Sequence, residues 1–200
     1  MKQKQNSVEV LKYLISHDYE MLNIANIAKG VNIDYKNTYN IIKNLQKDKI
    51  VNLKKIGNNN IVQFSKKLNP LVYEAEFNRR EQLFKNKEIK AIFSYLKNLY
   101  FPKIILLFGS HAKGLANHHS DIDLMVITNK NNEEEIELKL NTLPFDIHLL
   151  FFTYEEFIPM VISKEFTVVS EAIKNNIIIE GIEDYYNLLS SIKYEYNLTY

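Results

Sequence analysis

KIILLFGSHAKGLANHHSDIDLMVI, residues 103–127, is the stretch of this sequence that decides the fold. Its first six residues form a continuous β-prone run, which is what a buried central strand requires. The run ends in Gly109 and Ser110, where the chain is expected to turn sharply. A second apolar run at 124–127 predicts another strand. The stretch therefore predicts two strands joined by a turn and a polar loop.

Two acidic residues open the second predicted strand. Asp121 and Asp123 stand at positions i and i+2, so the strand period places both on one face and Ile122 on the other. Like charges this close repel each other unless a cation lies between them. Hard divalent ions prefer oxygen ligands and also bind phosphates, so the pair predicts a Mg²⁺ site that serves a nucleotide.

The stretch GSHAKGLANHHSDIDL resembles the signature of nucleotidyltransferases of the DNA-polymerase-β superfamily, a Gly-Ser pair followed ten residues later by Asp-x-Asp. The resemblance covers about residues 100–182. It implies that Gly109 and Ser110 hold the triphosphate of an NTP through backbone N–H groups and the Ser hydroxyl. It also implies that Asp121 and Asp123 bind metal, with two Mg²⁺ ions as cofactor and ATP as one candidate substrate.

Family members usually carry a third carboxylate on a later strand, where it completes the metal cage and can deprotonate the attacking hydroxyl. Asp146 is the candidate, because it lies in a β-like segment that follows a short helical stretch. A split βαβ connection would place it beside Asp123. Glu155 and Glu156 are weaker candidates, since they open the next helix, where acidic residues favour the helix dipole.

Basic and histidine side chains in and near the signature raise two further questions. Family members often have Arg where this chain has His111 or Lys113, and Lys113 can still meet a phosphate as a point charge. The histidines do not predict a zinc site, because no Cys joins them and no ligand spacing is evident. His118 and His119 fit a polar loop. His148 shares a strand face with Asp146, so a supporting role near the site stays open.

The N-terminal part of the chain predicts helices. A first helix is expected to begin after a cap at Asn6 or Ser7 and to run to about His17. A second begins near Asn23, and Gly30 is placed to end it in the left-handed conformation.

A third helix and a hairpin complete this part. Asp34 caps the third helix, which reaches about Lys47, and residues 50–64 hold two short β runs around a turn rich in Gly and Asn. The order of helix, helix, helix and hairpin resembles winged helix-turn-helix domains. The domain is set at residues 1–68.

By that resemblance the third helix enters the major groove of DNA and the hairpin lies near phosphates. Charge agrees, since residues 1–70 carry 12 Lys and no Arg against 5 acidic residues, whereas residues 71–200 carry 13 basic against 19 acidic residues. The alternatives are a solvated Lys-rich surface and a protein-docking module. The predicted DNA contacts are Tyr35, Lys36, Asn37, Tyr39, Asn40 and Lys43 on the helix, with Lys54 and Lys55 on the hairpin.

A helical connector is expected at residues 69–99. Asn69 and Pro70 pair a helix cap with Pro at the first helical position, and apolar residues recur at helical spacing to about Leu99. Part of it is a candidate dimerisation helix for a homodimer, although packing on its own domain is the commoner outcome. Beyond the predicted sheet, residues 154–173 are expected to be helical.

The sequence thus predicts an α+β protein with an N-terminal winged helix domain, a helical connector, and a nucleotidyltransferase domain with a mixed sheet at residues 100–200. The content of hydrophobic residues, 46%, suffices to bury a core. With no Cys, no signal-peptide pattern and no apolar stretch of bilayer length, a cytoplasmic protein without membrane contact is expected.

The resemblance implies transfer of NMP from an NTP to a hydroxyl, with two-metal assistance. At this size it is to the minimal type, some members of which act as antitoxins that modify a hydroxyl on a partner such as a HEPN-family toxin. A protein acceptor is therefore the first hypothesis. One alternative is a DNA-binding regulator whose nucleotidyltransferase domain senses nucleotide. Another is transfer to a small hydroxylated molecule.

Overall fold

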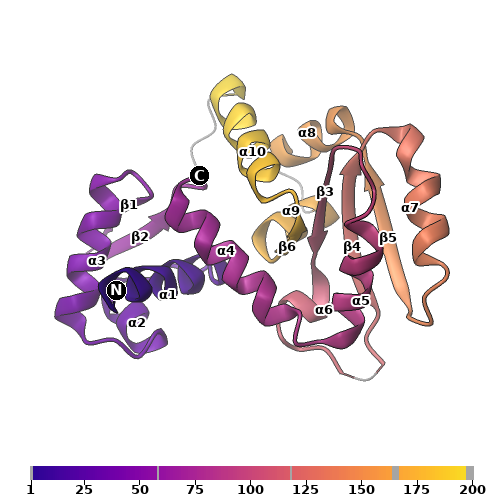
Figure 1. The fold of residues 1–200 in the computed structure, drawn as a ribbon. Coiled ribbons are helices and arrows are strands. Elements are labelled where there is room, and N and C mark those ends of the chain that lie inside the picture. The colour runs from indigo at the N-terminus through magenta and orange to yellow at the C-terminus, as the bar shows by residue number, and fades with distance from the viewer. Residues whose placement is uncertain (1, 58, 118, 164–166, 197–200) are drawn as a thin grey trace. The chain divides into compact units, whose positions relative to one another are not determined.

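The computed structural model describes residues 2–57, 59–117, 119–163 and 167–196. The chain divides into two compact units, and the boundary falls between Asn78 and Arg79, inside helix α4 (Pro70–Leu83) (Figure 1). Each unit has its own buried apolar core. Within the described ranges, no helix is both long and apolar enough to cross a bilayer.

Three helices and a hairpin make up most of the N-terminal unit, in the predicted order. An additional backbone link ties the loop before α2 to the hairpin, because Val62 N donates to Leu22 O at 2.8 Å. The elements are α1 (Lys2–Ser16), α2 (Ile24–Gly30), α3 (Tyr35–Lys47), β1 (Val51–Ile56) and β2 (Asn59–Phe64), and the two strands pair antiparallel.

One predicted helix cap in this unit is confirmed and one is wrong. Asp34 caps α3, as predicted, and accepts a hydrogen bond from Asn37 N at 2.9 Å. Helix α2 begins after Asn23, near its predicted start, and Asn23 forms a capping box there. The predicted cap at Asn6 or Ser7 is wrong, since α1 begins at Lys2. Ser7 Oγ instead donates to the Gln3 carbonyl one turn back, so this hydroxyl is satisfied inside the helix.

Gly30 does not adopt the predicted left-handed conformation. Asn32 does so instead, with φ of 54°. Gly30 is the last residue of α2, and a Cβ built on it would run into the ring of Tyr13. The glycine is therefore required for space rather than for backbone freedom.

The predicted continuous connector is two helices. Asn69 accepts from Leu71 N at 2.8 Å and starts α4 at Pro70, as predicted. A second helix, α5 (Lys87–Leu96), begins after Asn86, whose side chain accepts from Glu88 N and Ile89 N. The helix is interrupted between α4 and α5 because the Asn86 side chain caps the backbone N–H groups that follow it, which starts a new helix. The apolar face of α5 is fully buried in the C-terminal unit.

A mixed four-stranded sheet in the order β5-β4-β3-β6 forms the centre of the C-terminal unit, as predicted. Strand β3 pairs antiparallel with both β4 and β6, while β4 and β5 run parallel. The strands are β3 (Lys103–Leu107), β4 (Ile122–Thr128), β5 (Ile147–Phe152) and β6 (Ile177–Glu180).

Helices pack on both faces of this sheet (Figure 1). One face carries α5 and α7 (Glu133–Leu140), whose Ile92 and Ile136 pack with Ile105 and Leu124 of the central strands. Residues of opposite strand parity, such as Leu106, point to the other face, where α8 (Tyr154–Ile162) and α10 (Ile182–Tyr196) pack.

The predicted helical stretch at 154–173 is two helices. Thr153 caps α8 and Thr167 caps α9 (Val168–Lys174), each through a capping box. Residues 164–166 lie outside the described residues. At the tyrosine-rich end, Tyr185 and Tyr186 are buried in α10, so part of that composition belongs to the core.

Candidate active site

The residues of the signature meet at one edge of the sheet, where β3 ends and β4 and β5 begin. Because β3 is antiparallel to β4, its last residue lies beside the first residues of β4. The parallel strand β5 starts at the same edge. Two backbone hydrogen bonds fix this meeting point: Phe108 N donates to Asp123 O at 3.0 Å, and Ile122 N donates to Asp146 O at 2.9 Å.

Gly109 begins the short helix α6 (Gly109–Ala112) and lies directly against Asp123. Its φ is +67°, in the left-handed region, and a Cβ there would collide with Asp123 Oδ2. Two independent reasons thus require glycine, one conformational and one steric. The predicted Gly-Ser turn and the predicted carboxylate are in contact, although more than ten residues separate them in the sequence.

The loop between α6 and β4 is held by its own hydrogen bonds. Leu115 N donates to Ser110 O at 2.9 Å, and Asn117 N donates to Ser120 Oγ at 2.9 Å. The ring of His111 lies 3.3 Å from Ser120 O, measured from Nε2. His111 therefore braces the residue before Asp121. His119 is exposed, in agreement with a loop role, and His118 lies outside the described residues.

Asp123 forms a hydrogen bond with His148. The two residues are paired in register on the parallel strands β4 and β5, and His148 Nδ1 lies 3.2 Å from Asp123 Oδ1. The side chain of Asp123 is 26% exposed and that of His148 is 60% exposed. The strand period had placed His148 on the face of Asp146, and the structure gives it Asp123 as its direct partner.

Asp121 and Asp146 are both exposed and line one depression of about 340 Å³. Its other lining residues include Glu88 at the start of α5, His119 and Ser120. The strand that follows Asp146 runs parallel beside β4, which carries Asp123, as predicted. Asp146 itself was expected on that strand, but it lies just before it, because β5 begins at Ile147. The sequence pattern did not indicate Glu88 as a site residue, because its helix falls in the predicted connector. The Asn86 cap two residues earlier was the signal that could have revealed it.

The four acidic and histidine side chains form two neighbouring pairs rather than one cage. Asp121 shares the depression with Asp146, while Asp123 contacts His148. In the described part of the chain, no group of three or more His, Cys, Asp or Glu side chains is arranged to hold a metal ion. None of the three aspartates forms a salt bridge with a described Lys or Arg. Their oxygens are of the type that Mg²⁺ prefers, so the donor chemistry fits this ion.

Lys113 follows α6, and its ammonium group is paired with a carboxylate. Its Nζ lies 2.6 Å from Glu171 Oε1 on α9, and both side chains are about one-third exposed. Such a partly solvated pair contributes at most about 1 kcal/mol to stability, so a phosphate can compete for the lysine. Glu171 carried no sequence signal, because the contact spans two elements that lie far apart in the chain.

The two weaker candidates for the third carboxylate lie at a helix start, as predicted. Glu155 and Glu156 lie in the first turn of α8, and Glu156 Oε2 accepts from Thr153 N at 2.9 Å. This backbone hydrogen bond lowers the pKa of Glu156. Its carboxylate is therefore satisfied by the helix end, away from the aspartates.

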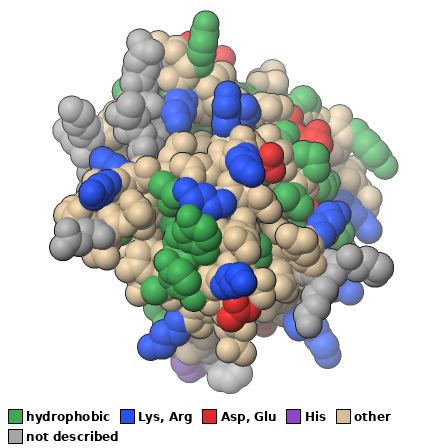
Figure 2. Space-filling model, turned by 90° about the vertical axis from the view of Figure 1, so that its left-hand side faces the viewer, with side chains coloured by type: hydrophobic (Ala, Val, Ile, Leu, Met, Phe, Trp, Pro, Cys, Tyr) green, Lys and Arg blue, Asp and Glu red, His purple; other side chains and the backbone are tan. Residues whose placement is uncertain are grey.

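The predicted DNA contacts lie in the N-terminal unit. Tyr35 and Tyr39 stack with ring centroids 6.4 Å apart, and Lys43 Nζ lies 5.7 Å from the Tyr39 ring centroid. All of the predicted contacts are exposed except Lys43, which is half-buried: Tyr35, Lys36, Asn37, Tyr39, Asn40 and Lys43 on α3, with Lys54 and Lys55 on β1. On the face of the molecule that Figure 2 presents, basic side chains predominate over acidic ones.

In comparison with known proteins, the C-terminal part of the chain matches a family model. Residues 87–183 match the family model described as Polymerase beta, Nucleotidyltransferase. The matched segment contains α5, the whole sheet and every residue at the sheet edge described above. No curated protein and no solved structure matched the chain significantly.

Proposed function

We propose that the Polymerase beta nucleotidyltransferase domain at residues 87–183 transfers NMP from an NTP to a hydroxyl acceptor and releases pyrophosphate. The observation that carries this proposal is the contact of Gly109 with Asp123 at the edge where Asp121 and Asp146 also lie. The oxygen of the acceptor hydroxyl attacks the α-phosphorus, and the bond to the pyrophosphate oxygen breaks.

The residues of the signature bind the triphosphate and the metal ions. Ser110, beside Gly109, holds the triphosphate through its hydroxyl and its backbone N–H, and Lys113 leaves Glu171 to contact a phosphate. Asp121, Asp123 and Asp146 would hold two Mg²⁺ ions, which would supply positive charge to the triphosphate.

The aspartates also have proposed roles of their own. Asp146 accepts the proton of the attacking hydroxyl, because its carboxylate is exposed beside Asp121 in the same depression. His148 orients Asp123 through the hydrogen bond between their side chains. Asp146 is thus the proton acceptor, and Asp123 is a carboxylate held in a fixed orientation.

The proposed acceptor is a hydroxyl on a partner protein, as in the antitoxin-like relatives that the signature resembles, and ATP is the first nucleotide to test. Two observations support a macromolecular acceptor. Asp121 and Asp146 are exposed, and the depression that they line is shallow enough to be open to solvent. A small hydroxylated acceptor is the competing hypothesis.

A second proposed function is binding of duplex DNA by the N-terminal unit. The stacked Tyr35 and Tyr39, with Lys43 over the second ring, form an exposed aromatic and basic surface on α3. Such a surface can contact bases and phosphates. If catalysis is absent, the same surface supports the alternative of a DNA-binding regulator that senses nucleotide.

Transfer is tested by incubating the full chain with each labelled NTP, Mg²⁺ and a lysate of the source cells. A labelled protein band that requires Mg²⁺ supports a protein acceptor, whereas label on a small molecule supports the competing hypothesis. Absence of both products, with nucleotide binding intact in calorimetry, favours the sensor. The control is Glu155→Gln, which changes an acid of α8 that lies outside the site.

A further inference from the structure

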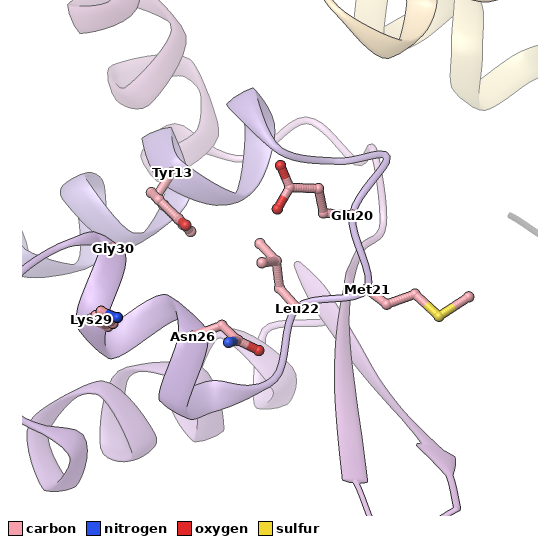
Figure 3. A pocket seen from close by; sticks show the side chains of 7 residues that line it. All are labelled: Tyr13, Glu20, Met21, Leu22, Asn26, Lys29 and Gly30. Carbon is pink, nitrogen blue, oxygen red and sulfur yellow. The ribbon is translucent and has the colours of Figure 1, made fainter.

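We propose that the N-terminal unit contains a binding site for a small zwitterion of the α-amino-acid type. The site is a hollow of about 640 Å³ between α1, the loop that follows it and α2 (Figure 3). Its volume lies within the range of small-molecule sites. The lining residues are Tyr13, Glu20, Met21, Leu22, Asn26, Lys29 and Gly30. None of them takes part in the functions proposed above.

Gly30 shapes one wall of this hollow. A Cβ at Gly30 would collide with the ring and hydroxyl of Tyr13. Its backbone is helical, and glycine in a helix costs about 1 kcal/mol relative to alanine, so the gain must come from the space it leaves. That space admits the phenol end of Tyr13.

Tyr13 is held in place from its other side. Its ring stacks on His17 with centroids 4.1 Å apart, and His17 Nδ1 lies 2.8 Å from the Tyr13 carbonyl oxygen. Figure 3 shows the Tyr13 hydroxyl and the Glu20 carboxylate turned toward the open space around Leu22, while Met21 points away from it. A rigid phenol and a carboxylate thus face the same volume.

The hollow brings together one charge of each sign. Glu20 supplies a carboxylate and Lys29 an ammonium group, and neither forms a salt bridge within the described ranges. Asn26 adds an amide, whose Oδ1 already accepts from Asn23 N at 3.3 Å. Leu22 is buried and provides an apolar floor.

These groups match the two ends of an amino acid. A ligand ammonium fits Glu20 and the Tyr13 hydroxyl, and a ligand carboxylate fits Lys29 and the Asn26 NH₂ group. A ligand with a single charge would satisfy only one of the two charged side chains. Because Met21 points away, Leu22 is the aliphatic side chain that faces the ligand side chain, which favours a small one.

Binding should also stabilise the unit, because the loop that forms the hollow is tied to the hairpin. Leu22 O accepts from Val62 N, and Asn23 pairs with Ile61. A ligand held by Tyr13 of α1, Glu20 of the loop and Lys29 of α2 therefore links three segments that unfolding would separate. Any ligand that binds only the folded state raises the melting temperature by mass action.

The test uses the full chain, with thermal unfolding and titration calorimetry against the standard α-amino acids at millimolar concentration. Ethylamine and acetate serve as probes that carry one charge each. At least one amino acid is expected to raise the Tm and to give a saturable heat, while the two probes do neither. Glu20→Gln and Lys29→Gln should each weaken binding by roughly 10- to 100-fold, the loss expected for a charge-assisted hydrogen bond.

Gly30→Ala should abolish binding by displacing Tyr13. If that variant does not fold, Tyr13→Phe takes its place, because it keeps the ring and removes only the hydroxyl. Lys47→Gln, an exposed lysine at the end of α3, is the matched control and should bind as the unchanged protein does. The proposal is overturned if no amino acid shifts the Tm, if ethylamine binds equally well, or if Glu20→Gln retains full affinity.

Discussion

The sheet edge of the C-terminal unit and the outer face of α3 are built in different ways. At the sheet edge, segments far apart in the sequence are joined by main-chain hydrogen bonds, from Phe108 to Asp123 and from Ile122 to Asp146. On α3, neighbouring turns of one helix present side chains such as Tyr35 and Tyr39, which contact each other and solvent. A convergent site depends on a few residues without substitutes, whereas a helical surface spreads its binding energy over many.

The largest effect is expected from Asp121→Asn combined with Asp123→Asn. The substitutions keep the shape of both side chains and remove the charge that would hold Mg²⁺. Loss of several kcal/mol of charge stabilisation should lower NMP transfer by about 1000-fold or more. Single-turnover assays with labelled NTP measure the effect, and circular dichroism checks the fold. Full transfer by a folded double variant would remove the sheet edge as the active site.

Asp146→Asn should separate binding from chemistry. Nucleotide should still bind through Ser110 and the first two aspartates, while transfer should fall by about 100- to 10,000-fold if Asp146 acts as the base. Nucleotide affinity and single-turnover rate are measured on the same samples. Glu156→Gln is the control, because this acid caps α8 and should leave the rate unchanged. A collapse of transfer in the control would show that the third carboxylate was wrongly chosen.

Gly109→Ala tests the contact with Asp123, and the chain offers a matched control. Gly109 and Gly114 have φ of +67° and +68°, but a Cβ at Gly114 has nothing within 4 Å. Both substitutions should cost about 1–2 kcal/mol of unfolding free energy for the left-handed backbone. Only Gly109→Ala should also displace the Asp123 carboxylate and lower transfer. Equal losses of activity in the two variants would mean that the contact does not matter.

The same contrast explains what the sequence could predict. The strands β3 and β4 and the motif between them were predictable, because a buried apolar run and a fixed spacing are local signals. The parallel strand that begins directly after Asp146 followed from the βαβ connection. The ion pair of Lys113 with Glu171 was not predictable, since it joins segments 58 residues apart and neither residue is unusual alone.

In the connector and in the N-terminal unit, the wrong predictions had a different cause. Helical periodicity continued across Asn86, so one helix was predicted where a side-chain cap separates two. Gly30 was interpreted by the usual rule for helix ends, while its role depends on Tyr13, which lies on another helix. Local patterns predict the elements, and the contacts between elements decide which rule applies at a given residue.

A smaller, graded effect is expected on the surface of the N-terminal unit. Lys54→Gln with Lys55→Gln should weaken DNA binding by the full chain and flatten the slope of log affinity against log salt by up to about 2, since each phosphate contact contributes roughly 0.9. Fluorescence anisotropy over a salt series measures the slope. Lys90→Gln with Lys97→Gln, exposed lysines of the C-terminal unit, is the control. An unchanged slope would exclude the hairpin from the DNA contact.

The smallest effect concerns acid stability, for which each unit supplies one capping carboxylate. The pKa of Asp34 is lowered by hydrogen bonds from Asn37, first from its backbone N–H and then from its side chain. A lowered folded-state pKa means that the folded chain binds fewer protons. The stabilising effect of the cap is therefore fully present above the unfolded value of about 3.9 and is lost as pH falls through the folded pKa. Asp34→Asn keeps a good cap without a titratable group, so its unfolding midpoint in urea should depend less on pH below about 4. NMR titration of the Asp34 carboxyl carbon measures the pKa directly.

The matched change in the other unit is Glu156→Gln. The backbone N–H of Thr153 lowers the pKa of Glu156, so this substitution should change the pH dependence of stability in the same direction. Identical pH dependence in the unchanged protein and in Asp34→Asn would show that this hydrogen bond does not persist in solution.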